Sequence, residues 1–180
     1  MQAFRSLLRP DEKTGAAMRW AHRLWVFLWL TVFGLGIGLL SLYLAAYSCP
    51  GIDAQALWAS YFKLPLLVVM NLLLPLLVVY LGFFLFARPW AAYLLSAVPF
   101  LGLALASYYK IQLRGDPVLA SDLRLIRTAG GIMGNYTFEL TEPVKLVIAG
   151  FAGMLALSLV LLRRERMSQR GRLAGLMVML

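Results

Sequence analysis

The sequence predicts an all-α, polytopic membrane protein with four complete transmembrane helices, the start of a fifth, and a short interfacial helix in one loop. Three observations support this fold class. Hydrophobic residues make up 62% and charged residues 14% of the chain, against roughly 45–50% and 25% in soluble proteins. Several uncharged stretches reach the ~20 apolar residues that cross a hydrocarbon core. Basic side chains gather at the ends of these stretches, as topology signals do.

Composition also excludes several classes of function. The formal net charge of +9 would point to nucleic acid in a soluble chain. Here the basic residues flank apolar segments, where they act as membrane topology signals, so no nucleic-acid partner is expected. The single cysteine, Cys49, cannot form an intramolecular disulfide, and one histidine with one cysteine cannot build a zinc site. The first apolar stretch follows a long basic segment and exceeds the hydrophobic part of a signal peptide, so none is predicted.

The N-terminal residues 1–23 are rich in arginine and are predicted to form a cytoplasmic basic segment. Residues 24–180 then form the transmembrane domain. Its first helix is predicted at about 24–47, a stretch without charged residues. Gly34 and Gly38 lie inside it as a small-xxx-small pair, which either lets a neighbouring helix approach closely or reflects ordinary glycine tolerance in a membrane helix.

A short connection at residues 52–63 precedes the second helix, predicted at about 64–87. Pro65 falls in its first turn, where the missing N–H is harmless, whereas Pro75 is central and should kink the helix. Asn71 is the one strongly hydrogen-bonding side chain at depth. We expect its amide to bond a neighbouring helix rather than a substrate.

The third helix, predicted at about 89–107, follows the tight basic turn at Arg88, so it should run antiparallel to the second. Pro99 gives it an internal kink. The fourth helix is predicted at about 143–162. A last apolar run at 173–180 is too short to span a bilayer and is interpreted as a truncated fifth helix.

Orientation follows from counting lysine and arginine on the two sides of these helices. Eleven flank the helices on the side of the N-terminus and six on the other side. By the positive-inside rule the first side is cytoplasmic. The loop at residues 108–142 is therefore expected to face outward.

This outward loop contains a mixture of predicted local structures. Apolar and polar residues alternate over residues 109–114, and this period of two predicts a short extended piece. Three residues then form a turn: Gly115, Asp116 and Pro117. Ser121 suits an N-cap, with Asp122 in the first turn of a short helix that Gly130 ends. This helix should lie on the membrane surface with its apolar side down.

Four basic side chains of this loop are candidates to bind a phosphate head group: Lys110, Arg114, Arg124 and Arg127. Four acidic residues are available to pair with them instead: Asp116, Asp122, Glu139 and Glu142. In that alternative the loop is neutral and only braces the bundle. The sequence contains no nucleophile-and-base pair, metal cluster or phosphate loop, so no catalytic residue, metal site or bound cofactor is predicted within this chain.

A family resemblance rests on the run YYKIQLRGDP at residues 108–117 and on Ser121, Asp122 and Leu123 after it. Together they resemble the outer loop in the membrane domain of bacterial lipoteichoic acid synthase-like proteins, which belong to the sulfatase and alkaline-phosphatase superfamily. In that family a membrane part of five helices precedes an extracellular catalytic domain, and the loop after the third helix carries a similar aromatic-Lys-x-x-x-Arg-x-x-Pro pattern. The order of the predicted helices agrees with that architecture.

The resemblance implies a place in the bacterial cell membrane, with the N-terminus cytoplasmic. The chain would be the anchoring and head-group-positioning part of an extracellular-facing phosphoglycerol transferase or sulfatase-family enzyme acting on a cell-envelope lipid or polymer. Implied partners are membrane lipids, including anionic phospholipid, and a C-terminal extracellular catalytic domain that uses a divalent metal such as manganese. That domain would lie after residue 180.

Two other interpretations stay open. The chain is either a small self-contained integral membrane protein that serves as an assembly or interaction partner, or part of a transporter whose path is lined by Asn71 and the kinks at Pro75 and Pro99. The transporter is less favoured, because no ionisable residue falls at mid-membrane depth.

Overall fold

The computed structural model describes residues 16–49, 51–119, 122, 139–162 and 177. Four long helices run through the described residues: α2 (Ala16–Ala46), α4 (Pro65–Phe86), α5 (Pro89–Arg114) and α7 (Glu142–Leu161). A short helix, α3 (Ala54–Tyr61), joins α2 to α4. The four long helices are each long and apolar enough to cross a membrane. The chain is therefore a multi-pass membrane protein, and the all-α polytopic fold class is confirmed.

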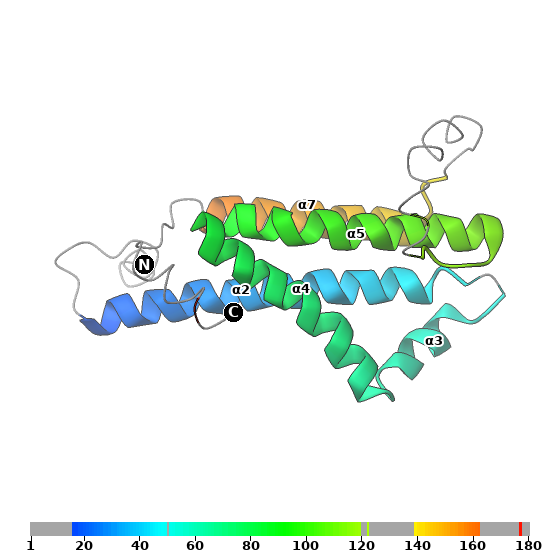
Figure 1. The fold of residues 1–180 in the computed structure, drawn as a ribbon, viewed down its shortest axis with the longest axis horizontal. Helices are drawn as coiled ribbons and strands as arrows, with labels where there is room; N and C mark the ends of the chain where they lie inside the picture. Colours follow the sequence, from blue (N-terminus) through cyan, green and yellow to red (C-terminus); the bar gives the residue numbers. More distant parts are fainter. Residues whose placement is uncertain (1–15, 50, 120–121, 123–138, 163–176, 178–180) are drawn as a thin grey trace.

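The helices form an antiparallel bundle in which α2 and α5 are the central pair (Figure 1). Both α4 and α7 contact α2 and also contact α5. The α2–α3 connection, the last turns of α5 and the start of α7 lie at one end of the bundle, which we call the loop end (Figure 1). The tight turn between α4 and α5 lies at the opposite end. Successive connections therefore lie at alternate ends of the bundle, as the predicted order of the helices requires.

Aromatic residues lock α2, α5 and α7 together in the core. Phe33 and Tyr93 are fully buried, and their rings meet edge to face with centroids 5.5 Å apart. The Tyr93 ring also stacks on Phe151 at 5.7 Å. Its hydroxyl donates to the backbone carbonyl of Phe151 at 3.1 Å, which satisfies a polar group in the interior.

The contact between α2 and α4 depends on two glycines. A Cβ placed on Gly34 would lie 2.7 Å from the Cα of Leu76, and one on Gly38 would lie 3.0 Å from the carbonyl oxygen of Asn71. Neither distance leaves room for a methyl group. The close-approach interpretation of this glycine pair is therefore confirmed, with α4 as the helix that approaches.

The first half of α4 departs from this packing and diverges from α2 toward the loop end (Figure 1). All buried residues of α4 lie at or after the proline inside the helix: Pro75, Val79, Gly82, Phe83 and Phe84. The short helix α3 likewise has no buried residue. We call residues 54–74 the α3–α4 arm. Many of its large apolar side chains are exposed, as lipid-facing residues are. Leu72 still lies against Gly38, and the Trp58 ring meets that of Tyr43 on α2 with centroids 5.9 Å apart.

The structure corrects one prediction about the polar segments and adds a helix to another segment. Residues 109–114 are not extended, because α5 continues through them and ends only at Gly115, whose φ of 80° gives a left-handed C-cap. Six residues are too few for a period of two to exclude a helix, and the Lys, Gln, Leu and Arg present there are good helix formers. The connection at 52–63 contains α3, whose N-cap Asp53 accepts the N–H of Gln55 at 3.0 Å.

Further differences concern the ends of helices and one polar side chain. The first helix begins at Ala16, earlier than the predicted residue 24. The side-chain amide of Asn71 donates to the carbonyl of Leu67 in its own helix at 2.8 Å, and not to a neighbouring helix as predicted. Two further predictions lie outside the described residues: the interfacial helix after Ser121, and the fifth helix apart from residue 177.

Candidate functional site

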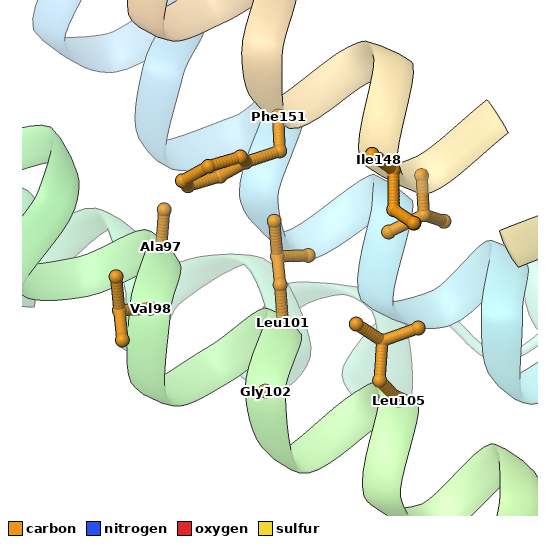
Figure 2. A pocket seen from close by; sticks show the side chains of 8 residues that line it. Ala97, Val98, Leu101, Gly102, Leu105, Ile148 and Phe151 are labelled. Carbon is orange, nitrogen blue, oxygen red and sulfur yellow. The ribbon is translucent and has the colours of Figure 1, made fainter. Parts of the chain in front are cut away.

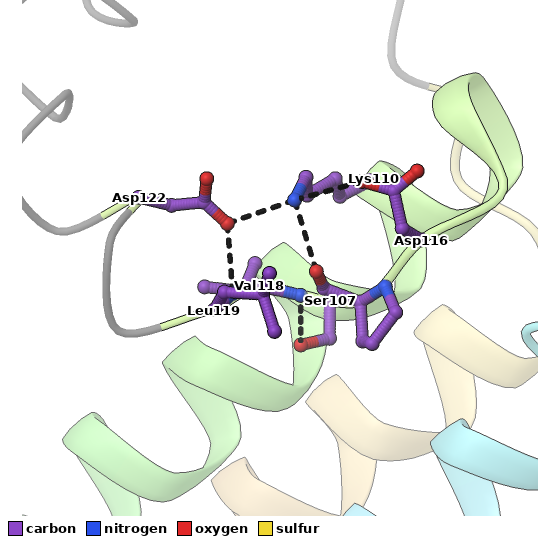
Figure 3. Close-up of polar contacts among 7 residues, drawn as sticks. Ser107, Lys110, Asp116, Val118, Leu119 and Asp122 are labelled. Atoms are coloured by element: carbon purple, nitrogen blue, oxygen red, sulfur yellow. Dashed lines mark hydrogen bonds and ion pairs between the residues drawn. The ribbon is translucent and has the colours of Figure 1, made fainter.

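A cluster of charged groups closes the loop end over the last turns of α5 (Figure 3). The ammonium nitrogen of Lys110 lies 2.8 Å from a carboxylate oxygen of Asp122 and 3.2 Å from one of Asp116. It also donates to the carbonyl of Pro117 at 2.9 Å. These contacts match the three protons of an ammonium group. The Lys110 side chain is 18% exposed. We refer to Lys110, Asp116, Pro117 and Asp122 as the Lys110 cluster.

Backbone hydrogen bonds fold the same segment back onto α5. The carboxylate of Asp122 accepts the N–H of Leu119 at 2.7 Å, and the hydroxyl of Ser107 accepts the N–H of Val118 at 3.3 Å (Figure 3). The hydrogen bond from Lys110 is the main reason why the pKa of Asp122 lies below its usual value, and the Leu119 N–H and the charge of Arg114 add to it. Residues 117–119 are thus held by Lys110, which bonds Pro117, and by Asp122, which bonds Leu119.

The structure brings together only some of the predicted head-group ligands. Lys110 pairs with two acidic residues, which fits the bracing alternative, and a phosphate would have to compete with both carboxylates. Glu142 forms its ion pair with Lys145, at 2.8 Å. Arg114 is exposed on the last turn of α5, and no carboxylate among the described residues forms an ion pair with it. Three predicted site residues lie outside the described residues: Ser121, Arg124 and Arg127.

Sequence reasoning missed a cavity of about 270 Å³ beneath this cluster. It lies between α2 and α5 and is lined by Ser41, Ala45, Ser48, Leu103, Ala104, Ser107, Tyr108, Ile111 and Pro117. Ser107 and Pro117 belong both to the cavity wall and to the hydrogen-bonded segment above it. The available sequence signal was the spacing of small residues on α2, where Ser41 and Ala45 continue the face of Gly34 and Gly38 at helical intervals.

The position of this cavity follows from the divergence of α4. The α2 face that Gly34 and Gly38 present to α4 continues toward the loop end as the cavity wall. No residue of α4 lines the cavity, because the α3–α4 arm has turned away at that level (Figure 1). A hollow is left where a straight α4 would have packed.

Three further hydrogen bonds hold the frame of the cavity in place. The hydroxyl of Tyr108 lies 2.8 Å from that of Thr141, just before α7. The hydroxyl of Tyr109 donates to the carbonyl of Glu139 at 2.9 Å. The side-chain amide of Gln112 donates to the carbonyl of Ser48, at the end of α2, at 3.1 Å. Both chain segments that enter the loop end are thereby tied to α5.

A second hollow, of about 190 Å³, lies between α5 and α7 (Figure 2). Its lining is entirely apolar: Ala97, Val98, Leu101, Gly102, Leu105, Val147, Ile148 and Phe151. No lining side chain carries a nitrogen or oxygen atom. Pockets select ligands through a few placed polar groups, so this hollow has no means to choose among apolar occupants.

The described residues contain no group of three or more His, Cys, Asp or Glu side chains that could hold a metal ion. The loop end therefore offers cationic and hydrogen-bonding groups next to an apolar hollow. Such a combination suits binding of an amphiphile. Comparison with protein-family models, with curated proteins and with solved structures gave no match to this chain.

Proposed function

We propose that this chain is a membrane domain that holds an anionic phospholipid at its outward end and positions the head group for an envelope phosphotransferase. The observation that carries the proposal is the contact between the Lys110 cluster and the cavity between α2 and α5. A charged rim directly above an apolar hollow matches the two parts of a phospholipid. The loop end is outward on this proposal because the basic residues favour the other side as cytoplasmic.

The length of α5 supports a place for this rim among the lipid head groups. Its 26 residues extend for about 39 Å at ~1.5 Å per residue, whereas the hydrocarbon core is about 30 Å thick. The last turns of α5 therefore rise beyond the hydrocarbon when the rest of the helix spans it. Lys110 and Arg114 lie on those turns.

The charges assign different roles to the two basic residues. Lys110 and Arg114 together balance Asp116 and Asp122, so the described part of the rim is neutral. Because the two carboxylates bind Lys110, the guanidinium of Arg114 is the group that is open to a phosphate. Arginine suits that role, since its donors bind phosphate oxygens in pairs. Arg124 and Arg127 stay predicted as additional contacts.

The enzymatic part of the proposal is supported by the loop resemblance alone. On that resemblance, the chain would lie in a bacterial cell membrane as part of a phosphoglycerol transferase or a related sulfatase-family enzyme. The chemistry and its divalent metal, such as manganese, would then belong to an extracellular catalytic domain outside these residues. This chain would contribute the anchor and the lipid.

The head-group role is tested by Arg114→Gln, with Lys63→Gln as the matched control. Lys63 is exposed at the same end of the bundle, so both variants remove one positive charge there. Binding of phosphatidylglycerol and of phosphatidylcholine is measured by native mass spectrometry of the purified chain. Loss of a charge-assisted hydrogen bond should weaken phosphatidylglycerol binding roughly tenfold in Arg114→Gln only. Unchanged selectivity for the anionic lipid in this variant would refute the proposed role.

The orientation is tested through Cys49, the single cysteine of the chain, which is partly exposed at the loop end. A membrane-impermeant maleimide should label it in intact cells stripped of their outer layers. Labelling that appears only after the membrane is permeabilised would place the loop end in the cytoplasm. The head-group proposal for an envelope enzyme would then be withdrawn.

The self-contained assembly partner is a second candidate, favoured by one observation. The α3–α4 arm contributes no buried residue before Pro75, so its exposed apolar side chains, including Leu66 and Leu73, are open to another protein. A photo-crosslinking residue at Leu73, compared with one at the buried Val79, distinguishes the occupants. Protein adducts at Leu73 favour assembly, and lipid adducts alone favour a simple lipid-facing arm.

A further inference from the structure

We infer that the cavity between α2 and α5 binds the glycerol-proximal part of one acyl chain of an ester-linked phospholipid, with the ester carbonyl on the hydroxyl of Ser107. The inference rests on the proposed function and adds to it the part of the lipid that the chain recognises below the head group. It assigns a specific ligand segment to a hollow that sequence patterns did not reveal.

The wall of the cavity suits a hydrocarbon segment. Most of its lining is aliphatic or aromatic carbon, including Ala45, Leu103 and Ile111. Along α5 the lining runs from residue 103 to residue 111, which at ~1.5 Å per residue is a length of about 12 Å. The volume of about 270 Å³ lies just below the roughly 300–1,000 Å³ of pockets that enclose a whole small ligand. The cavity therefore accommodates part of a lipid tail.

The polar groups of the wall single out one hydroxyl. Ser41 donates its proton to the carbonyl of Ile37 at 2.9 Å, and Ser48 donates to that of Ala45 at 2.6 Å. Ser107 instead accepts the Val118 N–H, and within the described part of the chain its own proton has no acceptor. A half-buried hydroxyl that lacks an acceptor gains from a carbonyl oxygen brought by a ligand.

The depth of Ser107 matches an ester group. It lies one turn below Lys110 on α5 and two turns below Arg114, which at ~5.4 Å per turn places its Cα about 10 Å beneath the Cα of Arg114. A phosphate at Arg114 is thus followed downward by a hydrogen-bond donor and then by an apolar wall. Phosphate, ester and tail occur in the same order in a glycerophospholipid.

Entry from the bilayer is provided by the diverging arm. Since no residue of α4 lines the cavity, a lipid can enter from the membrane between α2 and α5 without passing through water. The apolar hollow between α5 and α7 serves as an internal contrast. It lacks both a hydroxyl and a charged rim, so it is not expected to distinguish an ester from an ether lipid.

The experiment compares ester-linked with ether-linked phosphatidylglycerol, because the ether lipid lacks the carbonyl. Binding of both to the purified chain is measured by native mass spectrometry for the parent protein and for Ser107→Ala. The parent should bind the ester lipid about two- to tenfold more tightly, the range of one hydrogen bond. Ser107→Ala should bind both lipids equally, at the level of the ether lipid in the parent. No ester preference in the parent would overturn the ester contact.

A second pair of variants tests the tail. Ala104→Phe fills the cavity, whereas Ala106→Phe adds the same group at an exposed position on the same helix. The first should lower phosphatidylglycerol binding at least fivefold, and the second should leave it unchanged. Should Ala104→Phe fail to fold by circular dichroism, the Ser107→Ala result decides alone.

The two proposals fail in different ways. If Arg114→Gln abolishes selectivity for the anionic lipid while Ala104→Phe and Ser107→Ala change nothing, the head-group function stands and the tail site is wrong. If the cavity variants weaken binding of both lipids and Arg114→Gln does not, the tail site stands and the proposed function falls.

Discussion

Replacing Gly34 with alanine tests the claim that α2 and α4 are held together by a contact without room for a methyl group. The new Cβ would lie 2.7 Å from the Cα of Leu76 and 2.8 Å from one of its methyl groups. The backbone atom cannot rotate away, so the two helices must separate. Gly102→Ala is the matched control, because a Cβ there meets nothing within 4 Å.

The magnitude follows from two opposing effects. Both substitutions gain about 0.5–1 kcal/mol from the higher helix preference of alanine. Only Gly34→Ala carries an overpacking cost of about 1–3 kcal/mol. The difference between the two variants isolates that cost. At roughly 2–4 °C per kcal/mol for a chain of this size, Gly34→Ala should unfold about 2–12 °C below Gly102→Ala.

The assay is thermal unfolding of both variants in one detergent, followed by far-ultraviolet circular dichroism at a common heating rate. A common rate matters because the unfolding of membrane proteins is often irreversible and the midpoint then depends on it. Equal midpoints for Gly34→Ala and Gly102→Ala would show that α2 and α4 do not approach as closely as described.

Three further predictions concern the loop end and the core. Lys110→Met should expose residues 115–119 to limited proteolysis, because it removes both ion pairs and the bond to Pro117, whereas Lys145→Met should not; equal cleavage in both would contradict the role of Lys110. The lowered pKa of Asp122 means that its contribution is fully present above its unfolded value of about 3.9 and is lost as pH falls through the still lower folded value. Protection of the segment, measured by hydrogen exchange, should therefore persist to about pH 4 and fall below it, and Asp122→Asn should abolish this acid step. Tyr93→Phe should lower the unfolding free energy by only about 0.6 kcal/mol, because it loses the hydrogen bond to Phe151 but keeps the ring stack. A loss above ~2 kcal/mol in thermal unfolding would contradict this, because it would mean that the hydroxyl makes a larger contribution than this single hydrogen bond.

The sequence predicted those features of the fold that depend on local patterns. Uncharged runs bounded by proline or basic residues located the four spans to within a few residues at most ends. Two ends are exceptions: α5 continues to Arg114 and not to about residue 107, and α2 begins at Ala16 and not at residue 24. The second exception has a simple cause, since Ala16 to Arg23 mixes apolar and basic residues that a helix tolerates outside the bilayer. The spacing of Gly34 and Gly38 allowed either a close helix contact or ordinary glycine tolerance, and the structure decides for the contact and identifies α4 as its partner.

Features that depend on tertiary structure could not be predicted. The cavity exists because α4 diverges, and divergence is a property of how helices pack and not of any short run. The period of two at residues 109–114 was misleading, because the helix stops where Gly115 adopts a positive φ and not where hydrophobicity falls. The pairing of Lys110 with Asp116 and Asp122 was one of two open alternatives, and only distances could favour it.

The α3–α4 arm has a practical consequence. No residue of α4 before Pro75 is fully buried, and exposed side chains there, such as Leu73, face away from the core of the bundle. An environment-sensitive fluorophore at Leu73 would thus report bilayer thickness and fluidity while the bundle itself stays intact. In α4, the residues from Pro75 onward support the bundle, and the exposed residues before Pro75 respond to the bilayer.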